Sequence, residues 1–333
     1  MKRIAYLLGL AGLAAAIVLV ARAGWHAVLD ALAAAGLQLL WLVPLRVIPI
    51  ALDAAGWRLL LAPRDPQHRA AWPVLLATAV VREAVNRLLP VAGVGGELVG
   101  VRIVVRRGLE PAPVATSVIT EVVLTLLCLV LFAALGLALL VASTRGAGSL
   151  DSIFIGVLLA SPIPIAGLWL INEGRLVAWL QRFAAVVTGS TGQVPPWLQS
   201  MVAFEVELAG LARRRGRLAL AALCQLAGMM VGASEVWLAL KLLGHPVSVG
   251  TALIIESVVL FVRNLAFAIP AGLGAQEAGV VLICAAVGLS QELAIGLALA
   301  KRMREVLFGL PALLGWHLWE STRGVPGIPA ASK

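Results

Sequence analysis

The sequence is poor in charged residues, in cysteine and in tyrosine. Only 13% of its 333 residues are charged and 61% are hydrophobic, whereas soluble domains contain about 25% charged residues. So little charge does not provide the polar surface of a globular domain in water, which excludes an ordinary soluble enzyme or binding domain. We therefore expect an integral membrane protein.

The three cysteines and four histidines form no recognisable metal or disulfide motif. Cys128, Cys224 and Cys284 each lie in an apolar block, without a Cys-x-x-Cys pair or a Cys/His spacing typical of zinc sites. The histidines are far apart in the sequence as well. The sequence thus indicates neither a disulfide framework nor a metal site, and we expect no cofactor.

Motifs of soluble catalysis are also missing. The chain contains no phosphate-binding G-x-x-x-x-G-K-[ST] loop, no H-E-x-x-H and no G-x-S-x-G. We therefore expect no ATP hydrolysis and predict that the chain is not an enzyme. One enzymatic alternative stays open, in which an intramembrane enzyme uses Glu97 and Glu277 as paired carboxylates in acid-base work.

Long apolar blocks are what the sequence contains in abundance. Blocks of about 18 to 30 residues recur, and no series of alternating, strand-like segments accompanies them. Helices are the expected spans, because a helix satisfies its own backbone hydrogen bonds in lipid. The predicted fold is an all-α polytopic membrane protein with six crossings, at about 4–21, 37–62, 112–142, 151–171, 217–243 and 291–317.

The basic residues predict how the chain is oriented in the membrane. With a cytoplasmic N-terminus, fourteen basic residues of loops and tails lie inside, and only Arg22 and Arg145 lie outside. This asymmetry follows the positive-inside rule, and its largest contributor is a basic loop at about 172–216. It also explains the formal net charge of +9 without nucleic-acid binding. We expect both termini to be cytoplasmic.

Landmark residues recur in the sequence at an offset of 180 residues. The matched pairs are Trp57 and Trp237, Pro66 and Pro246, Pro90 and Pro270, Glu97 and Glu277, and Gly108-Leu109 and Gly288-Leu289. These rarer residue types are informative, because apolar helices often match one another through leucine and alanine alone. The repeated unit is a helix, a broken pair and a helix. Three crossings separate the starts of the two units, so the second unit is expected to be inverted, as in many transporters.

The repeat divides the chain into five parts. These are an N-terminal transmembrane helix with its connector (1–36), repeat 1 (37–142), a linking transmembrane helix with the basic loop (143–216), repeat 2 (217–320) and a cytoplasmic tail (321–333).

Each broken pair consists of two short apolar arms joined at a proline. The pairs cover about 74–107, with Pro90, and about 250–287, with Pro270. An arm of about 16 to 18 residues spans roughly 24–27 Å, a little less than the ~30 Å hydrocarbon core. We therefore expect two re-entrant hairpins, and the alternative is full spanning with tilt or local thinning of the bilayer. The expected tips contain Pro90, Gly93 and Gly96 in the first hairpin and Pro270, Gly272 and Gly274 in the second.

Charged residues inside the apolar blocks are the candidate binding residues. Spacing of four residues predicts the pairs Glu83–Arg87 and Lys301–Glu305, and the 180-residue offset suggests a Glu121–Lys301 bridge between the repeats. The roles of Asp53, Glu235 and Glu256 stay open. Glu97, Glu277, Arg263 and Arg302 have no obvious partner four residues away. A charged residue inside the membrane without a partner is a candidate functional group. The expected headgroup pocket is lined by Glu97, Glu277, Arg82, Glu83, Arg87, Arg263 and Arg302.

Three segments resemble a known family. They are VREAVNRLLPVAGVGGELVGVRIVVRRG (81–108), TSVITEVVL (116–124) and VRNLAFAIPAGLGAQEAG (262–279), and they resemble the lysylphosphatidylglycerol synthase transmembrane or flippase-like family. The first segment is most similar to the branch associated with hopanoid biosynthesis, although Val91-Ala92-Gly93 stands where many members have an arginine soon after the proline. The resemblance implies lipid translocation in the bacterial inner membrane. Synthase members carry a further soluble aminoacyl-transferase domain, which we do not expect in this chain, and so no synthase activity is expected.

Two functions from different classes follow. The first is translocation of a hopanoid or another polar-headgroup lipid by alternating access around a midplane site. The second is a non-transporting scaffold or regulator of lipid-synthesis enzymes that uses the basic loop, with Arg213-Arg214-Arg215, as its contact surface. Expected partners are a membrane lipid and, as candidates, lipid-biosynthesis or lipid-transport proteins. A groove from the bilayer to the charged residues favours the first, and a sealed core favours the second.

Overall fold

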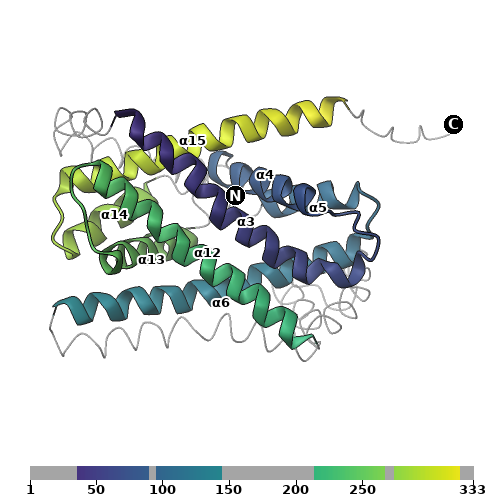
Figure 1. The fold of residues 1–333 in the computed structure, drawn as a ribbon, viewed down its shortest axis with the longest axis horizontal. Helices are drawn as coiled ribbons and strands as arrows, with labels where there is room; N and C mark the ends of the chain where they lie inside the picture. The colour runs from purple at the N-terminus through teal and green to yellow at the C-terminus, as the bar shows by residue number, and fades with distance from the viewer. Residues whose placement is uncertain (1–35, 90–94, 145–213, 267–273, 323–333) are drawn as a thin grey trace, which may run out of the picture.

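The structure is a computed structural model that describes residues 36–89, 95–144, 214–266 and 274–322 (Figure 1). Within these ranges the chain forms eight α-helices, two short 3-10 helices and no strand. The predicted all-α fold is confirmed. Several expected features lie outside the described residues: the crossings at 4–21 and 151–171, most of the basic loop, and the tip residues Pro90, Gly93, Pro270 and Gly272.

The first repeat contains four α-helices. After the 3-10 helix η1 (Gly36–Trp41) come α3 (Leu42–Leu61), η2 (Ala62–Arg64), α4 (Trp72–Leu88), α5 (Gly95–Val105) and α6 (Pro111–Thr144). Proline stands in the first turn of both α4 and α6, where its missing N–H removes no helical hydrogen bond. The broken pair of the sequence is therefore the pair α4 and α5.

The second repeat has the same order of helices. They are α12 (Arg215–Leu242), α13 (Val249–Leu265), α14 (Ala275–Ala286) and α15 (Gln291–Thr322). The Ser248 side chain caps α13 by accepting a hydrogen bond from the Thr251 backbone N–H at 3.0 Å. The broken pair of this repeat is α13 and α14.

Helix boundaries repeat at the offset that the sequence indicates. The helices α5 and α14 begin at Gly95 and Ala275, and α6 and α15 begin at Pro111 and Gln291, so that each pair is separated by 180 residues. Gly108 and Gly288 follow α5 and α14 with φ angles of +88° and +81°. A left-handed backbone favours glycine, which explains why both repeats have this residue at the same place.

The equivalent helices α3 and α12 lie side by side and run antiparallel (Figure 1). Gly228 of α12 packs against Pro49, whereas Gly56, further along α3, packs against Ala221 and Cys224, which come earlier in α12. An inverted repeat requires opposite directions for equivalent helices, and this pair meets that requirement.

Helices of each repeat pack against helices of the other repeat. The hairpin helix α4 of repeat 1 packs on α15 of repeat 2, and α13 of repeat 2 packs on α6 of repeat 1. The α6–α13 contact is very close at Gly136, where a Cβ atom would lie 1.7 Å from the Ser257 Oγ. The interior is therefore built between the repeats, from helices of both.

Three described segments are long and apolar enough to cross a membrane: Gly36–Arg64, Pro111–Ser143 and Arg215–Leu242. They correspond to the expected crossings at 37–62, 112–142 and 217–243. The expected crossing at 291–317 is a helix of 32 residues, but it is not in this group. Lys301, Arg302, Arg304 and Glu305 lie near its centre and interrupt its apolar sequence.

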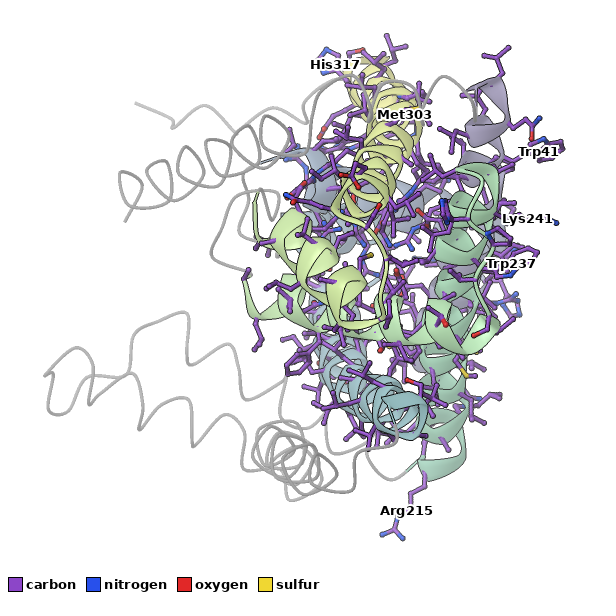
Figure 2. The ribbon with its side chains drawn as sticks, turned by 90° about the vertical axis from the view of Figure 1, so that its left-hand side faces the viewer. Trp41, Arg215, Trp237, Lys241, Met303 and His317 are labelled. Atoms are coloured by element: carbon purple, nitrogen blue, oxygen red, sulfur yellow. The ribbon has the colours of Figure 1, made fainter. Side chains whose placement is uncertain are left out.

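The two equivalent tryptophans have different surroundings. Trp57 is fully buried and donates a hydrogen bond from Nε1 to the Ser117 Oγ at 2.9 Å. Trp237 lies on the outer side of α12, with the Lys241 Nζ 5.1 Å from its ring centroid (Figure 2). The repeats thus share their helices but not all of their side-chain environments.

Candidate functional site

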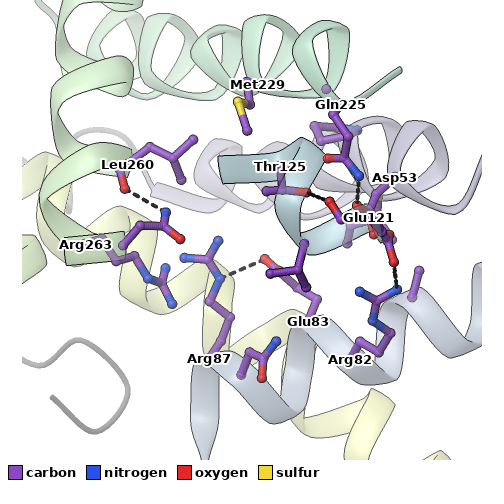
Figure 3. A pocket seen from close by; sticks show the side chains of 18 of the residues that line it. Asp53, Arg82, Glu83, Arg87, Glu121, Thr125, Gln225, Met229, Leu260 and Arg263 are labelled. Atoms are coloured by element: carbon purple, nitrogen blue, oxygen red, sulfur yellow. Dashed lines mark hydrogen bonds and ion pairs between the residues drawn. The ribbon is translucent and has the colours of Figure 1, made fainter. Parts of the chain in front are cut away.

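A cavity of about 330 Å³ lies between the two repeats (Figure 3). Residues of α3, α4, α5, α6, α12 and α13 line it. Its charged lining residues are Arg46, Asp53, Arg82, Glu83, Arg87, Glu97, Glu121, Glu256 and Arg263. These nine charged side chains come from both repeats.

One face of α4 provides much of this lining. Ala79, Arg82, Glu83, Asn86 and Arg87 all line the cavity. Their spacing of three and four residues places them on one side of the helix. The polar positions that the sequence shows in this arm therefore face the cavity together.

The cavity contains five of the seven residues that the sequence marks as headgroup ligands. Arg82, Glu83, Arg87, Glu97 and Arg263 line it.

Glu277 and Arg302, which the sequence also marks, are not among the residues that line this cavity. The Arg302 Nε donates to the Glu277 Oε1 at 2.6 Å, and the other Glu277 oxygen accepts from the Gly274 backbone N–H at 2.7 Å. Glu277 therefore caps the start of α14 while Arg302 compensates its charge. Glu97 and Glu277 are equivalent in sequence but not in surroundings.

One part of the cavity is acidic. Here the Arg82 Nη1 lies 2.9 Å from a Glu121 oxygen, and the Arg82 Nη2 lies 3.5 Å from the Glu97 Oε1. Asp53 accepts a hydrogen bond from the Gln225 amide at 2.7 Å. We call Asp53, Glu97 and Glu121 with Arg82 the acidic group, because it contains three carboxylates and one arginine.

Packing around Arg82 holds this arginine in place. Its guanidinium lies over the Trp57 ring, 4.9 Å from the centroid. A Cβ atom on Gly96 would lie 2.5 Å from the Arg82 carbonyl oxygen, and one on Gly100 would lie 2.7 Å from the Arg82 Cδ. The two glycines of α5 therefore leave the space that α4 needs.

Asn86 connects the two arms of the first hairpin. Its amide Nδ2 donates to both Glu97 oxygens, at 3.1 and 3.2 Å, and its Oδ1 accepts from the Gly96 backbone N–H at 2.8 Å. Glu97 is consequently held on the cavity wall by Asn86 and Arg82.

A second set of ion pairs surrounds Glu83 and Glu305. The Glu83 Oε1 accepts from the Arg46 Nη2 at 2.6 Å and from the Arg87 Nε at 2.9 Å, which confirms the predicted Glu83–Arg87 pair. The Glu305 oxygens accept from Arg87 at 3.4 Å, Arg263 at 3.0 Å and Arg302 at 2.8 Å. The carboxylate of Glu305 thus joins α15 to a hairpin helix of each repeat.

Two predicted ion pairs are wrong. Lys301 binds Glu256 of α13 and not Glu305, which is occupied by three arginines. Glu121 binds Arg82 and not Lys301. In both cases the closest opposite charge comes from a packed neighbouring helix, which spacing along one helix does not reveal.

The sequence did not mark Arg46 as a site residue, although a signal was present. Arg46, Pro49, Ile50 and Asp53 follow helical spacing in one apolar block, and all four line the cavity. For Glu305 the sequence shows Arg302 three residues away but not its other two partners, Arg87 and Arg263, which lie 218 and 42 residues away in the chain.

Apolar residues form another part of the cavity wall. Val122 and Leu126 of α6, Met229 of α12 and Leu260 of α13 line it, and Leu126 is 39% exposed. The cavity is therefore amphipathic: most of its charged side chains come from α3, α4 and α5, with Glu121 of α6 and Glu256 and Arg263 of α13, and apolar side chains of α6, α12 and α13 form another part of its wall. Among the described residues no group of His, Cys, Asp or Glu has the arrangement of a metal site.

Comparison with known proteins gives one match. A family described as "Lysylphosphatidylglycerol synthase TM region" matches residues 6–314. No curated protein and no solved structure matches the chain.

Proposed function

Since the chain belongs to the lysylphosphatidylglycerol synthase TM region family, and is thus a membrane protein related to lipid metabolism, we propose that it translocates a polar-headgroup lipid across the membrane. The amphipathic cavity between the repeats is the observation that carries this proposal. In it the headgroup contacts the charged side chains, while the acyl or polycyclic tail leaves along the apolar wall.

The energetic cost of the charged residues supports a use for them. An ionised side chain at the centre of a membrane helix costs about 2.5–3.5 kcal/mol even on the most lenient insertion scale. Arg82, Glu83 and Arg87 follow one another on a single helix face, and they reduce this cost by pairing across helices. Simple packing needs no such residues, because apolar side chains of similar size fill a helix interface at lower cost.

The lining also supports binding that is weak enough for release. Each charge-assisted hydrogen bond contributes about 1.5–3 kcal/mol, so one or two of them hold a headgroup without trapping it. The acidic group can accept from hydroxyl or amine groups, which the hopanoid suggested by the sequence resemblance and amine-bearing lipids both offer.

A transport role is favoured over the two alternatives. An intramembrane enzyme with Glu97 and Glu277 as paired carboxylates finds no support, because only Glu97 lines the cavity. The alternative role as a scaffold for lipid-synthesis enzymes depends on the basic loop. Most of this loop lies outside the described residues, and no observation favours the scaffold role. We propose that the protein works in the bacterial inner membrane with both termini in the cytoplasm, by alternating exposure of the cavity.

A vesicle assay tests the proposal. Full-length protein is reconstituted with a trace of lipid whose fluorescent headgroup is bleached by dithionite from the outer leaflet. We expect bleaching beyond the outer-leaflet half for the wild type, and a rate about ten-fold lower for Glu97→Gln, which loses the charge that Arg82 and Asn86 hold.

The control is Glu320→Gln, since Glu320 pairs with Arg102 and Arg106 away from the cavity lining. Parallel vesicles carry a hopanoid polyol or a phospholipid as the labelled lipid. Bleaching that stops at the level of protein-free vesicles for every lipid would refute translocation.

A further inference from the structure

We propose that Arg87 and Arg263, one from each repeat, form an anion-binding pair that takes the phosphate group of a lipid in the cavity. The inference rests on the proposed function and names the chemistry of its substrate. Its basis is the position of these two arginines between the cavity and a buried carboxylate.

The two guanidinium groups converge on one atom. The Nη1 atoms of Arg87 on α4 and Arg263 on α13 both donate to the Glu305 Oε1, at 3.4 and 3.0 Å. They therefore lie within two hydrogen-bond lengths of each other, and Figure 3 shows both side chains at the cavity. A single oxyanion can bridge two guanidinium groups at such a separation.

Glu305 lies behind the pair. Its side chain is 1% exposed, whereas the side chains of Arg87 and Arg263 are 14% and 12% exposed. Both arginines line the cavity, and Glu305 does not. Glu305 consequently fixes the two arginines from the protein side and leaves their other side to a ligand.

Both arginines retain N–H groups for that ligand. Arg87 uses Nε for Glu83 and Nη1 for Glu305, and Arg263 uses Nη1 for Gln276 and Glu305. The Nη2 atoms of Arg87 and Arg263 are not among the buried, unpartnered polar atoms of the described residues, and the two side chains are 14% and 12% exposed. The Nη2 groups of Arg87 and Arg263 are thus accessible from the cavity.

The ion pairs around Arg87 and Arg263 are locally rich in arginine. Ion pairs link Arg87 and Arg263 into one network of five arginines and four glutamates, which carries one positive charge in excess. Its members are Arg46, Arg87, Arg263, Arg302, Arg304, Glu83, Glu235, Glu277 and Glu305. Over the whole cavity lining five carboxylates stand against four arginines, so the local arginine pair, and not the net charge of the cavity, is what would hold the single negative charge of a phosphodiester.

The apolar wall identifies the source of the phosphate. Leu126, Met229 and Leu260 line the same cavity as the arginine pair. A soluble phosphate gains nothing from these side chains, whereas the tail of a lipid removes its apolar surface from contact with water there. A lipid phosphodiester therefore fits the whole cavity.

Native mass spectrometry of the full-length protein in detergent tests the inference, because it resolves each bound lipid by mass. Three probes separate the sources: dioleoylphosphatidylglycerol, dioleoylglycerol without the phosphate, and glycerol 3-phosphate without the tails. We expect the wild type to bind the phospholipid at least ten-fold more tightly than either of the other probes. In Arg87→Gln and in Arg263→Gln this preference over dioleoylglycerol falls about ten-fold.

Both variants are expected to fold. Without Arg87, Glu83 keeps Arg46 and Glu305 keeps Arg263 and Arg302, so no carboxylate is left unpaired. Arg263→Lys keeps the charge but loses the planar fork, and its affinity is expected between those of the wild type and Arg263→Gln. The control Arg102→Gln removes a 56% exposed arginine outside the cavity lining and should bind like the wild type.

Three results would overturn the inference. The first is unchanged preference for the phospholipid in both glutamine variants. The second is equal binding of dioleoylglycerol by the wild type. The third is arginine-dependent binding of glycerol 3-phosphate as tight as that of the phospholipid, which would make this a site for soluble phosphate. Binding is measured without transport, so arginine-dependent binding in a protein that fails the vesicle assay would refute translocation alone.

Discussion

At the scale of single residues, Glu305 links three helices through one buried carboxylate. It accepts from arginines of α4, α13 and α15, and its side chain is 1% exposed. Removing one partner from a buried ion-pair network leaves the opposite charges uncompensated, which costs more than the pairs contribute. Substitution of Glu305 should therefore lower the free energy of unfolding more than substitution of a residue in a surface ion pair.

We expect Glu305→Gln to lower the free energy of unfolding by about 3–5 kcal/mol, measured in detergent by chemical denaturation. The matched control is Glu320→Gln, whose side chain is 26% exposed and pairs with two arginines near the surface. Surface pairs contribute about 1 kcal/mol or less. Similar losses in the two variants would show that the Glu305 network does not stabilise the fold.

At the scale of helices, close contact between α6 and α13 depends on one glycine. The contact joins the last helix of one repeat to the hairpin of the other. At Gly136 a new Cβ would lie 1.7 Å from the Ser257 Oγ and 2.7 Å from its Cβ. Because a helix backbone moves less easily than a side chain, substitution here should separate the two helices.

Gly136→Ala is expected to destabilise the protein by about 1–3 kcal/mol through overpacking. Ser257→Gly removes the atoms that the new methyl group meets, so the double variant Gly136→Ala/Ser257→Gly should recover most of the loss relative to Ser257→Gly alone. Thermal unfolding of the wild type and the three variants gives the coupling energy between positions 136 and 257. Additive effects would mean that the two residues do not touch. Gly216→Ala serves as control, since nothing lies within 4 Å of its added Cβ.

At the scale of the whole molecule, the antiparallel pair of α3 and α12 fixes how the repeats face each other. Gly56 lies where an added Cβ would be 3.5 Å from the Cβ of Cys224. Disulfides need Cβ atoms about 3.5–4.5 Å apart. The native cysteine therefore offers a direct test of the arrangement.

We expect Gly56→Cys to form an intramolecular disulfide with Cys224 under mild oxidation, detected by mass spectrometry of the digested protein. The double variant Gly56→Cys/Cys224→Ser should give no cross-link, and neither should Gly216→Cys, which is far from any contact. Failure of the first variant to cross-link would contradict the antiparallel pairing. If the repeats move as bodies, the cross-linked protein should also translocate lipid more slowly than its reduced form.

The positions of most described helices could be predicted from the sequence, but fewer of the ion pairs between helices could. Rare residues at a 180-residue offset indicated the repeated helices, since prolines and glycines mark helix ends directly. The cavity residues of α4 followed from polar groups in an apolar arm. The partners of Lys301 and Glu305 could not be predicted, because they depend on which helices of different repeats come into contact. For the same reason the sequence did not show that Glu97 lines the cavity whereas Glu277 caps α14 and pairs with Arg302.

The exchange of helices between repeats has a consequence for how the protein is made. Arg87 and its partner Glu305 are 218 residues apart, so the ribosome completes α4 long before α15 exists. At about 5–20 residues per second, the first hairpin waits roughly 10 to 45 seconds for that carboxylate. During this interval Glu83 is the only described acidic partner of Arg87 that has been synthesised. The ion pairs behind the cavity are therefore completed last, and a nascent chain interrupted before α15 lacks the carboxylate that pairs with Arg87 and Arg263.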